Sequence, residues 1–235
     1  MRTTCLLNCF CLLLVPAAQA GIISYSATDG PIADGNPAGL SATAAVSDYP
    51  SSISGVTVSL DISGGYNGDL YAYLSYGGVL VPLLNRAGVT GDNASGYGNQ
   101  GFNITLSSSA SGAQDVHCYG NYSPSYNEQG QLTATWQPDG RRIDPQSSPG
   151  SFDTADRLGF GSYNGMNPNG IWTLYIADLS PGGQSRLENW SLGFSPVPEP
   201  VNMALPFLAG VYVVFILSRS RRVQNLFRRP PVPPG

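Results

Sequence analysis

Apolar and polar residues alternate strictly in several short stretches of this chain. Val58, Leu60 and Ile62 alternate with Ser59 and Asp61, within a longer alternating stretch over residues 56–62. Successive side chains of a β-strand point to opposite faces, so this pattern predicts a strand with one buried and one exposed face. The same alternation predicts further strands over residues 70–74, 102–106, 172–176 and 190–194.

Clusters of glycine, asparagine and proline separate these predicted strands. They occupy residues 64–68, 77–78, 164–165, 167–170 and 181–183. Glycine and asparagine tolerate positive φ and proline fixes φ, so such clusters favour tight turns. Many short strands joined in this way indicate an antiparallel β-sandwich or barrel. We expect irregular structure in three other segments: a lead-in over residues 29–39, a loop over residues 107–113 and an excursion from the sheet over residues 137–151.

Two longer apolar stretches, one near each end of the chain, do not alternate. Near the start, Arg2 precedes an apolar stretch over residues 5–15, and Ala18-Gln19-Ala20 follows it. A basic start, a short apolar core and small residues at a cleavage site are typical of a secretory signal peptide. We therefore predict that residues 1–20 are removed and that Gly21 is the mature N-terminus. The alternative is an uncleaved anchor.

The second apolar stretch, residues 201–217, contains no charged side chain. As a helix it would be about 26 Å long at about 1.5 Å per residue, close to the bilayer core of about 30 Å. Arg219, Arg221 and Arg222 follow it. Because an arginine at the bilayer centre costs about 3 kcal/mol, this pattern predicts a transmembrane helix over residues 201–217 and a basic stop over residues 219–222. A Pro/Arg-rich tail over residues 223–235 completes the chain.

Charge divides the chain into an acidic part and a basic end. All 15 acidic residues lie between Asp29 and Glu199, together with only five arginines, so this segment carries 5 − 15 = −10. That charge argues against nucleic acid or anionic lipid as a partner. Five more arginines follow residue 217, and the positive-inside rule then predicts a cytoplasmic tail and a domain on the other side of the membrane.

The only histidine, His117, lies beside Cys118, the one cysteine outside the predicted signal peptide. One cysteine cannot form an internal disulfide, so residues 21–195 must be held together by their core. A Ser-His-Asp triad would require His117. Adjacent residues of a strand point to opposite faces, so a Cys-His dyad is disfavoured as well. The sequence contains no nucleophile elbow, zinc-protease motif or phosphate-binding loop, and we predict that the protein is not an enzyme.

The tripeptide Pro198-Glu199-Pro200 stands directly before the predicted membrane helix. The order of tripeptide, apolar helix and basic cluster resembles the PEP-CTERM sorting signal of Gram-negative bacteria, here over residues 196–222 with its motif at residues 197–200. The resemblance implies export through the Sec translocon, recognition by an exosortase and removal of the tail. The domain would lie in the periplasm, anchored to the inner membrane, before it reaches the cell surface or the extracellular matrix. The alternative is an ordinary C-terminal membrane anchor.

Two parts of the strand region carry a second resemblance. They contain Gly68-Asp69-Leu70 and, later, Gly170-Ile171-Trp172-Thr173-Leu174, Asp178 and Trp190-Ser191-Leu192. This pattern resembles the P (Homo B) domain of proprotein convertases over residues 53–194, and residues 89–157 depart from it. The resemblance implies a jelly-roll-like antiparallel β-sandwich for residues 21–195. P domains normally accompany a subtilisin-like catalytic domain, of which this sequence shows no motif.

Two kinds of side chain could bind a ligand. Asp69 and Asp178 match P-domain positions, and some P domains bind calcium, which prefers several oxygen ligands. Aspartates in turns also bond their own backbone, so a structural role stays open. Tyrosines could form a sugar-stacking or protein-contact surface, although tyrosine also simply favours strands. The candidates are Tyr66, Tyr71, Tyr73, Tyr76 and Tyr97.

These observations lead to one hypothesis and one alternative. The leading hypothesis is an exported, non-catalytic β-sandwich of the cell surface or extracellular matrix, sorted through Pro198, Glu199 and Pro200. The alternative is a glycan- or calcium-dependent binding module, associated with extracellular polysaccharide. A protease-associated role would rest on the P-domain resemblance alone.

Overall fold

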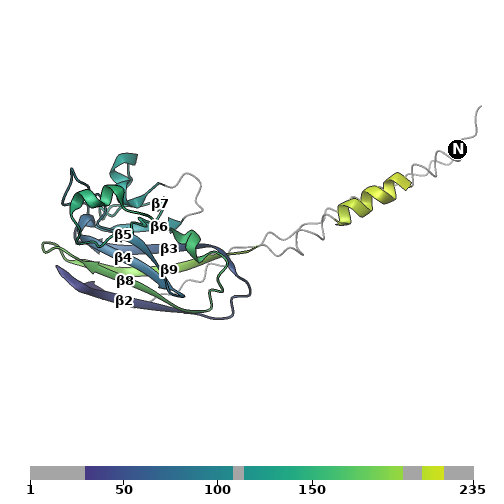
Figure 1. Cartoon of the computed structure of the whole chain (residues 1–235), viewed down its shortest axis with the longest axis horizontal. Coiled ribbons are helices and arrows are strands. Elements are labelled where there is room, and N and C mark those ends of the chain that lie inside the picture. The colour runs from purple at the N-terminus through teal and green to yellow at the C-terminus, as the bar shows by residue number, and fades with distance from the viewer. Residues whose placement is uncertain (1–29, 108–113, 198–207, 220–235) are drawn as a thin grey trace, which may run out of the picture. The chain divides into compact units, whose positions relative to one another are not determined.

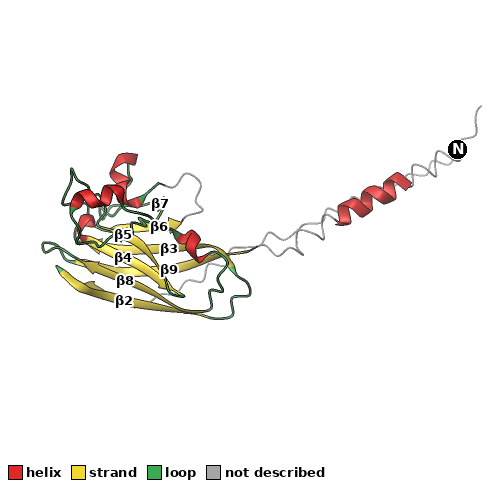
Figure 2. Cartoon of the chain, in the orientation of Figure 1, coloured by secondary structure: helices red, strands yellow, loops and turns green. Residues whose placement is uncertain are grey.

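The computed structural model describes residues 30–107, 114–197 and 208–219 (Figure 1). The contacts divide the chain into a compact body that ends at Val197 and a second unit that contains residues 208–219. Strands make up most of the regular structure of the body, and its helices are short (Figure 2). The predicted all-β class is therefore confirmed.

Two sheets form the body. The first has the strand order β1-β9-β3-β6-β7, formed by β1 (Gly30–Ile32), β9 (Ser185–Pro196), β3 (Ile53–Gly64), β6 (Phe102–Ser107) and β7 (Thr135–Trp136). The second has the order β2-β8-β4-β5, formed by β2 (Asn36–Val46), β8 (Gly170–Asp178), β4 (Leu70–Tyr76) and β5 (Val79–Asn85). Four 3-10 helices lie in the connections: η1 (Asn67–Asp69), η2 (Val116–Tyr122), η3 (Pro149–Thr154) and η4 (Phe160–Tyr163).

The alternating stretches identified in the sequence all lie in these strands. In β3, Val58 and Leu60 are buried and pair with Leu192 and Trp190 of β9. Their polar neighbours on β3 point to the opposite, outer face, as the period of two requires. Because β3 pairs with β9 on one side and β6 on the other, burial of this strand fixes the register of the whole first sheet.

The second sheet contributes Trp172, one of the largest buried side chains. Its indole stacks on the ring of Tyr76 at a centroid distance of 4.1 Å, and its Nε1 donates a hydrogen bond to the carbonyl of Pro168 at 2.8 Å. Tyr163 and Phe194 also pack against it, with centroids 5.1 Å away in each case. Trp172 therefore joins the two sheets through one aromatic cluster whose polar atom is satisfied.

The expected irregular lead-in over residues 29–39 is largely strand, so that prediction is wrong. β1 pairs with β9, and β2 begins at Asn36 and pairs with β8. A shift of register between Asn36 and Leu40 accommodates Gly39, which has φ +59° and lies so close to Tyr175 that a Cβ would be 2.9 Å from its ring. The buried positions of β2 are Ala42, Ala44 and Val46, and because two of the three are small alanines, alternation gives a weak signal there.

The connections hold two further findings. β7 pairs with β6 in parallel, whereas the sequence indicated antiparallel strands only. The expected excursion over residues 137–151 is present, and its backbone donates hydrogen bonds from Asp139 and Gly140 to the carbonyls of Leu83 and Pro82 on β5. These bonds attach the excursion to the edge strand of the second sheet.

A separate helix covers residues 208–219, about 18 Å at 1.5 Å per residue. Among the described residues, no helix is long and apolar enough to cross a membrane. Arg219 is the last described residue of this helix and is exposed. Residues 1–29, 198–207 and 220–235 lie outside the described residues, and with them lie the predicted signal peptide, the Pro-Glu-Pro motif, the first part of the predicted span, Arg221 and Arg222.

Replacing Trp172 should test how far the two sheets depend on this cluster. We expect Trp172→Ala to lower the free energy of unfolding by about 3–5 kcal/mol, because it removes a large buried ring and leaves a cavity. The control is Ile171→Ala, on the same strand but 60% exposed, which should change it by less than about 0.5 kcal/mol. Urea unfolding followed by circular dichroism measures both, and equal effects would contradict this account of the core.

Candidate functional site

Asp69 and Asp178 are brought together at one end of the second sheet. Asp69 ends η1 and Asp178 ends β8. The residue after Asp69, Leu70, pairs in register with Asp178, and the amide of Leu179 donates a hydrogen bond to the carbonyl of Asp69 at 2.9 Å. The neighbouring strands β4 and β8 therefore hold the two aspartates at fixed positions near one another.

Asp178 is a buried carboxylate whose contacts come from its own turn. Its Oδ2 accepts a hydrogen bond from Ser185 Oγ at 3.1 Å, and its Oδ1 accepts one from the Ser180 amide at 3.4 Å. Burial raises the pKa of Asp178 to about 6, and the nearby charges of Asp69 and Asp34 add to the rise. The hydrogen bonds from Ser185 and Ser180 lower the pKa, but they offset only part of this rise.

Asp69 is more accessible and lines an open pocket of about 410 Å³. Burial raises its pKa, against the opposing effects of the Ser180 side chain and the positive charge of Arg86. We call this cavity the Tyr66 pocket. Its lining residues come from η1 and the turn before it, the segment after β5 and the turn between β8 and β9: Tyr66, Asp69, Arg86, Ser95, Gly96, Tyr97, Gly98, Ser180 and Pro181.

Arg86 stands in the pocket in an uncommon backbone conformation. Its φ is +51°, in the left-handed region that non-glycine residues rarely adopt. Its amide donates to the carbonyl of Leu70 at 2.9 Å, its carbonyl accepts from Val89 at 3.0 Å, and its Nε donates to the carbonyl of Gly68 at 3.2 Å. These bonds hold the residue where β5 ends and direct a guanidinium to the pocket.

Tyr97 forms another wall of the pocket and is fixed by its neighbours. Its amide donates to the carbonyl of Ala87 at 2.9 Å, and its ring packs on Tyr119 with centroids 4.4 Å apart. Gly88 has φ +85°, and a Cβ there would be 2.6 Å from the Tyr97 ring, so a side chain would displace this wall. The pocket is therefore built on tightly packed backbone.

Asp69 and Asp178 are the residues for which the sequence predicts calcium binding. Among the described residues, no three histidine, cysteine, aspartate or glutamate side chains are grouped so that they could hold a metal ion. Asp34, the third carboxylate near Asp178, accepts the amide of Gly182 at 3.1 and 3.2 Å. Asp178 is likewise bonded by its own turn, as aspartates in turns commonly are. Calcium binding by Asp69 and Asp178 stays a prediction from the sequence.

His117 is part of a buried network and does not face Cys118. Its Nδ1 lies 2.7 Å from Asp139 Oδ2, and its Nε2 lies 2.9 Å from the carbonyl oxygen of Val89. Both ring nitrogens thus face acceptors, and both contacts are hydrogen bonds only when both nitrogens carry hydrogen. His117 and Cys118 lie in the 3-10 helix η2, so the expected strand is wrong there, although the two side chains do contact different partners.

Arg141 extends this network to the surface. It bonds Asp139 Oδ1 at 3.2 Å and Asp115 Oδ2 at 2.9 Å, and Arg157 also approaches Asp115 at 3.2 Å. Cys118 donates its thiol proton to Asp115 Oδ2 at 3.4 Å. Burial and the negative charge of Asp115 raise the pKa of the Cys118 thiol, which disfavours the nucleophilic thiolate.

The five candidate tyrosines do not share one surface. Tyr66 is 43% exposed and lines the pocket with Tyr97. Tyr71 and Tyr73 lie on the outer face of the second sheet with Tyr175, whose ring stacks on Tyr73 at 4.8 Å. Burial raises the pKa of Tyr71 to about 12. Tyr76 is partly buried, stacks on the core residue Trp172, and points its hydroxyl at the carbonyls of Asn167 and Asn169.

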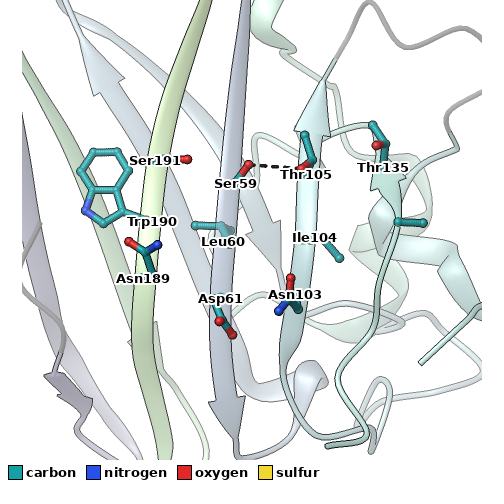
Figure 3. A pocket seen from close by; sticks show the side chains of 11 residues that line it. Ser59, Leu60, Asp61, Asn103, Ile104, Thr105, Thr135, Asn189, Trp190 and Ser191 are labelled. Atoms are coloured by element: carbon teal, nitrogen blue, oxygen red, sulfur yellow. Dashed lines mark hydrogen bonds between the residues drawn. The ribbon is translucent and has the colours of Figure 1, made fainter. Parts of the chain in front are cut away.

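A second concavity, of about 370 Å³, lies on the outer face of the first sheet (Figure 3). Its accessible side chains form two rows across the strands. Asn189, Asp61 and Asn103 form one row, and Ser191, Ser59, Thr105 and Thr135 form the other. Ser59 and Thr105 hydroxyls are 3.2 Å apart. This polar groove has no exposed aromatic ring, since Trp190 is buried.

Sequence reasoning missed two residues that matter to the Tyr66 pocket. Arg86 was one of only five arginines in the acidic segment, and that rarity could have singled it out. Ser180 lies in a predicted turn, and its proximity to Asp69 arises only when β8 pairs with β4. Asp139, the centre of the His117 network, carried no local signal.

No protein-family model matches this chain, and no curated protein matches it. Among solved structures, the serine protease of Aeromonas sobria is similar, with a TM-score of 0.38 and 14% sequence identity. The similarity covers 75% of this chain and 27% of the protease, so the chain spans about a quarter of that protein's length. A TM-score this low does not establish a shared fold.

The raised pKa of Asp178 predicts a particular dependence of stability on pH. The folded protein holds this proton more tightly than the unfolded chain, whose aspartate titrates near about 3.9. The ionised Asp178 therefore lowers the free energy of unfolding, and this effect is complete above about pH 6. The effect disappears as Asp178 becomes protonated in the folded protein and the pH falls toward about 4. We expect the melting temperature of the native protein to rise from pH 7 to pH 5 relative to that of Asp178→Asn.

Two features make that comparison decisive. Asp69 contributes in the same direction, so Asp178→Asn should flatten the profile only in part. The exposed Asp92→Asn serves as the control and should follow the native profile. Parallel profiles for all three proteins would contradict the role assigned to Asp178.

We expect substitution of Asp139 to destabilise the fold strongly. Its side chain is fully buried, and Asp139→Asn removes the charge that faces His117 and Arg141. We expect a loss of about 3–5 kcal/mol in the free energy of unfolding, because the buried His117 ring and the part-buried Arg141 guanidinium lose the carboxylate that they contact. Glu128→Gln, at an exposed position, should change it by less than about 0.5 kcal/mol. An Asp139→Asn protein as stable as the native one would refute this.

Proposed function

We propose that this chain is an exported, non-catalytic β-sandwich protein that a C-terminal sorting segment holds at a membrane until it is processed. The observation that carries the proposal is the boundary at Val197. β9 ends at Pro196, and the amide of Val197 makes the last described bond of the body, to the carbonyl of Ser52 at 2.9 Å. Pro198-Glu199-Pro200 begins at the next residue.

The order of residues after that boundary supports sorting. A charge-free stretch over residues 201–217 and then Arg219, Arg221 and Arg222 follow the tripeptide, as in PEP-CTERM signals. An exosortase would recognise Pro198, Glu199 and Pro200, and the arginines would stop transfer of the tail. In this proposal residues 1–20 direct the chain to the Sec translocon, and the sandwich resides in the periplasm and then at the surface or in the matrix.

The P-domain resemblance supports a jelly-roll-like topology for the sandwich. The residues that carry the resemblance lie in η1 and at the start of β4 (Gly68-Asp69-Leu70), on β8 (Trp172) and on β9 (Trp190). The role we propose for it is that of a folded module without a catalytic centre.

The absence of catalysis is part of the proposal and rests on two side chains. Both ring nitrogens of His117 are engaged by Asp139 and the carbonyl of Val89. The Cys118 thiol is bonded to Asp115, and its pKa is raised. Neither is free to act as a base or nucleophile.

The intact mass of the mature protein from its own host tests the proposal directly. We expect a chain that begins at Gly21 and ends near residues 198–201, with or without an added group. A mass that runs through Gly235 would mean that the tail is a permanent anchor and that no exosortase acts on it.

Charge-altering variants of the tail add a matched test. Replacing Arg219, Arg221 and Arg222 together by Asp should impair anchoring or processing, because the positive stop is lost. Replacing the same three residues by Lys preserves the charge and should leave localisation and mass unchanged. Identical localisation and mass for the Asp variant would refute the role of these residues.

A further inference from the structure

We propose that the Tyr66 pocket binds a neutral carbohydrate, with one pyranose ring stacked on Tyr66 and its hydroxyls bound by Asp69 and Arg86. This assigns a ligand class to a cavity that the proposed sorting function does not use. The inference rests on the combination of an exposed ring, an acceptor and a donor in one pocket of about 410 Å³, a volume within the range of small-molecule sites.

Tyr66 supplies an exposed aromatic face. The residue is 43% exposed. Its ring lies beside the turn between β8 and β9, where a Cβ on Gly183 would be 3.4 Å from it, an ordinary contact distance. An exposed ring supported on one side can stack its free face on the apolar face of a sugar.

Asp69 and Arg86 supply the polar contacts. Both line the pocket, yet among the described residues no ion pair within 4.0 Å joins them. Arg86 uses Nε for the carbonyl of Gly68, and its Nη groups make no hydrogen bond with the described residues. A guanidinium donates two parallel hydrogen bonds and a carboxylate accepts two, so the pair suits vicinal hydroxyls of a sugar. Ser95 and Ser180 add hydroxyl groups.

The charges favour a neutral ligand. Asp69 has the buried Asp178 and Asp34 beside it, so a negatively charged ligand would meet several carboxylates. The positive charge of Arg86 opposes a free cation in the same space. An uncharged molecule with several hydroxyl groups can accept hydrogen bonds from Arg86 and donate them to Asp69. It is repelled neither by the carboxylates nor by the guanidinium.

The backbone arranges these groups in advance. Arg86 is held at φ +51° by its bonds to Leu70 and Val89. A left-handed backbone conformation in a residue other than glycine persists only where the surrounding structure imposes it. In proteins, such residues occur most often at binding and catalytic sites. Tyr97, packed on Tyr119, closes the adjoining wall. The site thus requires little rearrangement when a ligand enters.

Saturation-transfer NMR and titration calorimetry on the purified full chain test this proposal. The probes are neutral hexasaccharides of glucose, mannose, galactose and xylose at millimolar concentration, with hexagalacturonate as the anionic comparison. The detergent must carry no sugar headgroup. We expect at least one neutral hexasaccharide to bind and hexagalacturonate to bind at least tenfold more weakly.

Variants then locate the site. Tyr66→Ala should weaken binding about tenfold or more, while Tyr66→Phe, which keeps the ring, should retain it. Asp69→Asn and Arg86→Gln should each weaken binding, and melting curves verify that all variants fold. Tyr122→Ala is the matched control, because Tyr122 is equally exposed, at 44%, but lies outside the pocket.

Three results would overturn the proposal. The first is no binding of any neutral hexasaccharide, and the second is a preference for hexagalacturonate. The third is normal binding by folded Tyr66→Ala together with loss of binding by Asn103→Ala, which would place the site in the polar groove of the first sheet (Figure 3). None of these results depends on whether the tail is processed.

Discussion

The pairing of β3 with β9 is the constraint on which the rest of this structure depends. β9 lies between β1 and β3, and β3 lies between β9 and β6, so the two strands fix the register of the first sheet. Their inward residues, Leu60 and Trp190 among them, belong to the core between the sheets. Because β9 is the last strand of the described residues, the core closes only when almost all of the described body is present, and such distant pairings form slowly in folding.

A network of charged side chains stabilises the segment between β6 and β8, most of which lies outside the two sheets. In the long segment between β6 and β8, the residues that the structure describes form mainly 3-10 helices and turns, and the two-residue β7 is their only strand. Cys118 is its one cysteine and is free. In place of a disulfide, Asp139 joins His117 to Arg141, and Asp115 joins Arg141 to Arg157. Such a network holds a loop-rich segment only while every buried charge keeps its partner.

In the Tyr66 pocket too, paired strands and the connections between them have different roles. Paired strands β4 and β8 set the distance between Asp69 and the turn at Ser180, and the end of β5 sets Arg86. The groups that would contact a ligand thus lie on short connections between rigid strands. Substitutions in such connections disturb the packing of the core little. The sorting signal proposed for the C-terminus begins where this body ends, so delivery and binding would be separate properties of one chain.

Alternation in the sequence by itself determined five strands and the all-β class, because a period of two has one physical meaning when one face is buried. The resemblance to P-domain motifs singled out Asp69 and Asp178. Alternation did not reveal β2, whose inward residues include the small Ala42 and Ala44, nor the parallel β7, since both exist through pairing with distant strands. Only tertiary structure decided that Tyr76 packs against the core while Tyr66 stays exposed, that Asp139 contacts His117, and that Arg86 lines the Tyr66 pocket. These outcomes depend on neighbours far away in the chain, and local patterns do not record them.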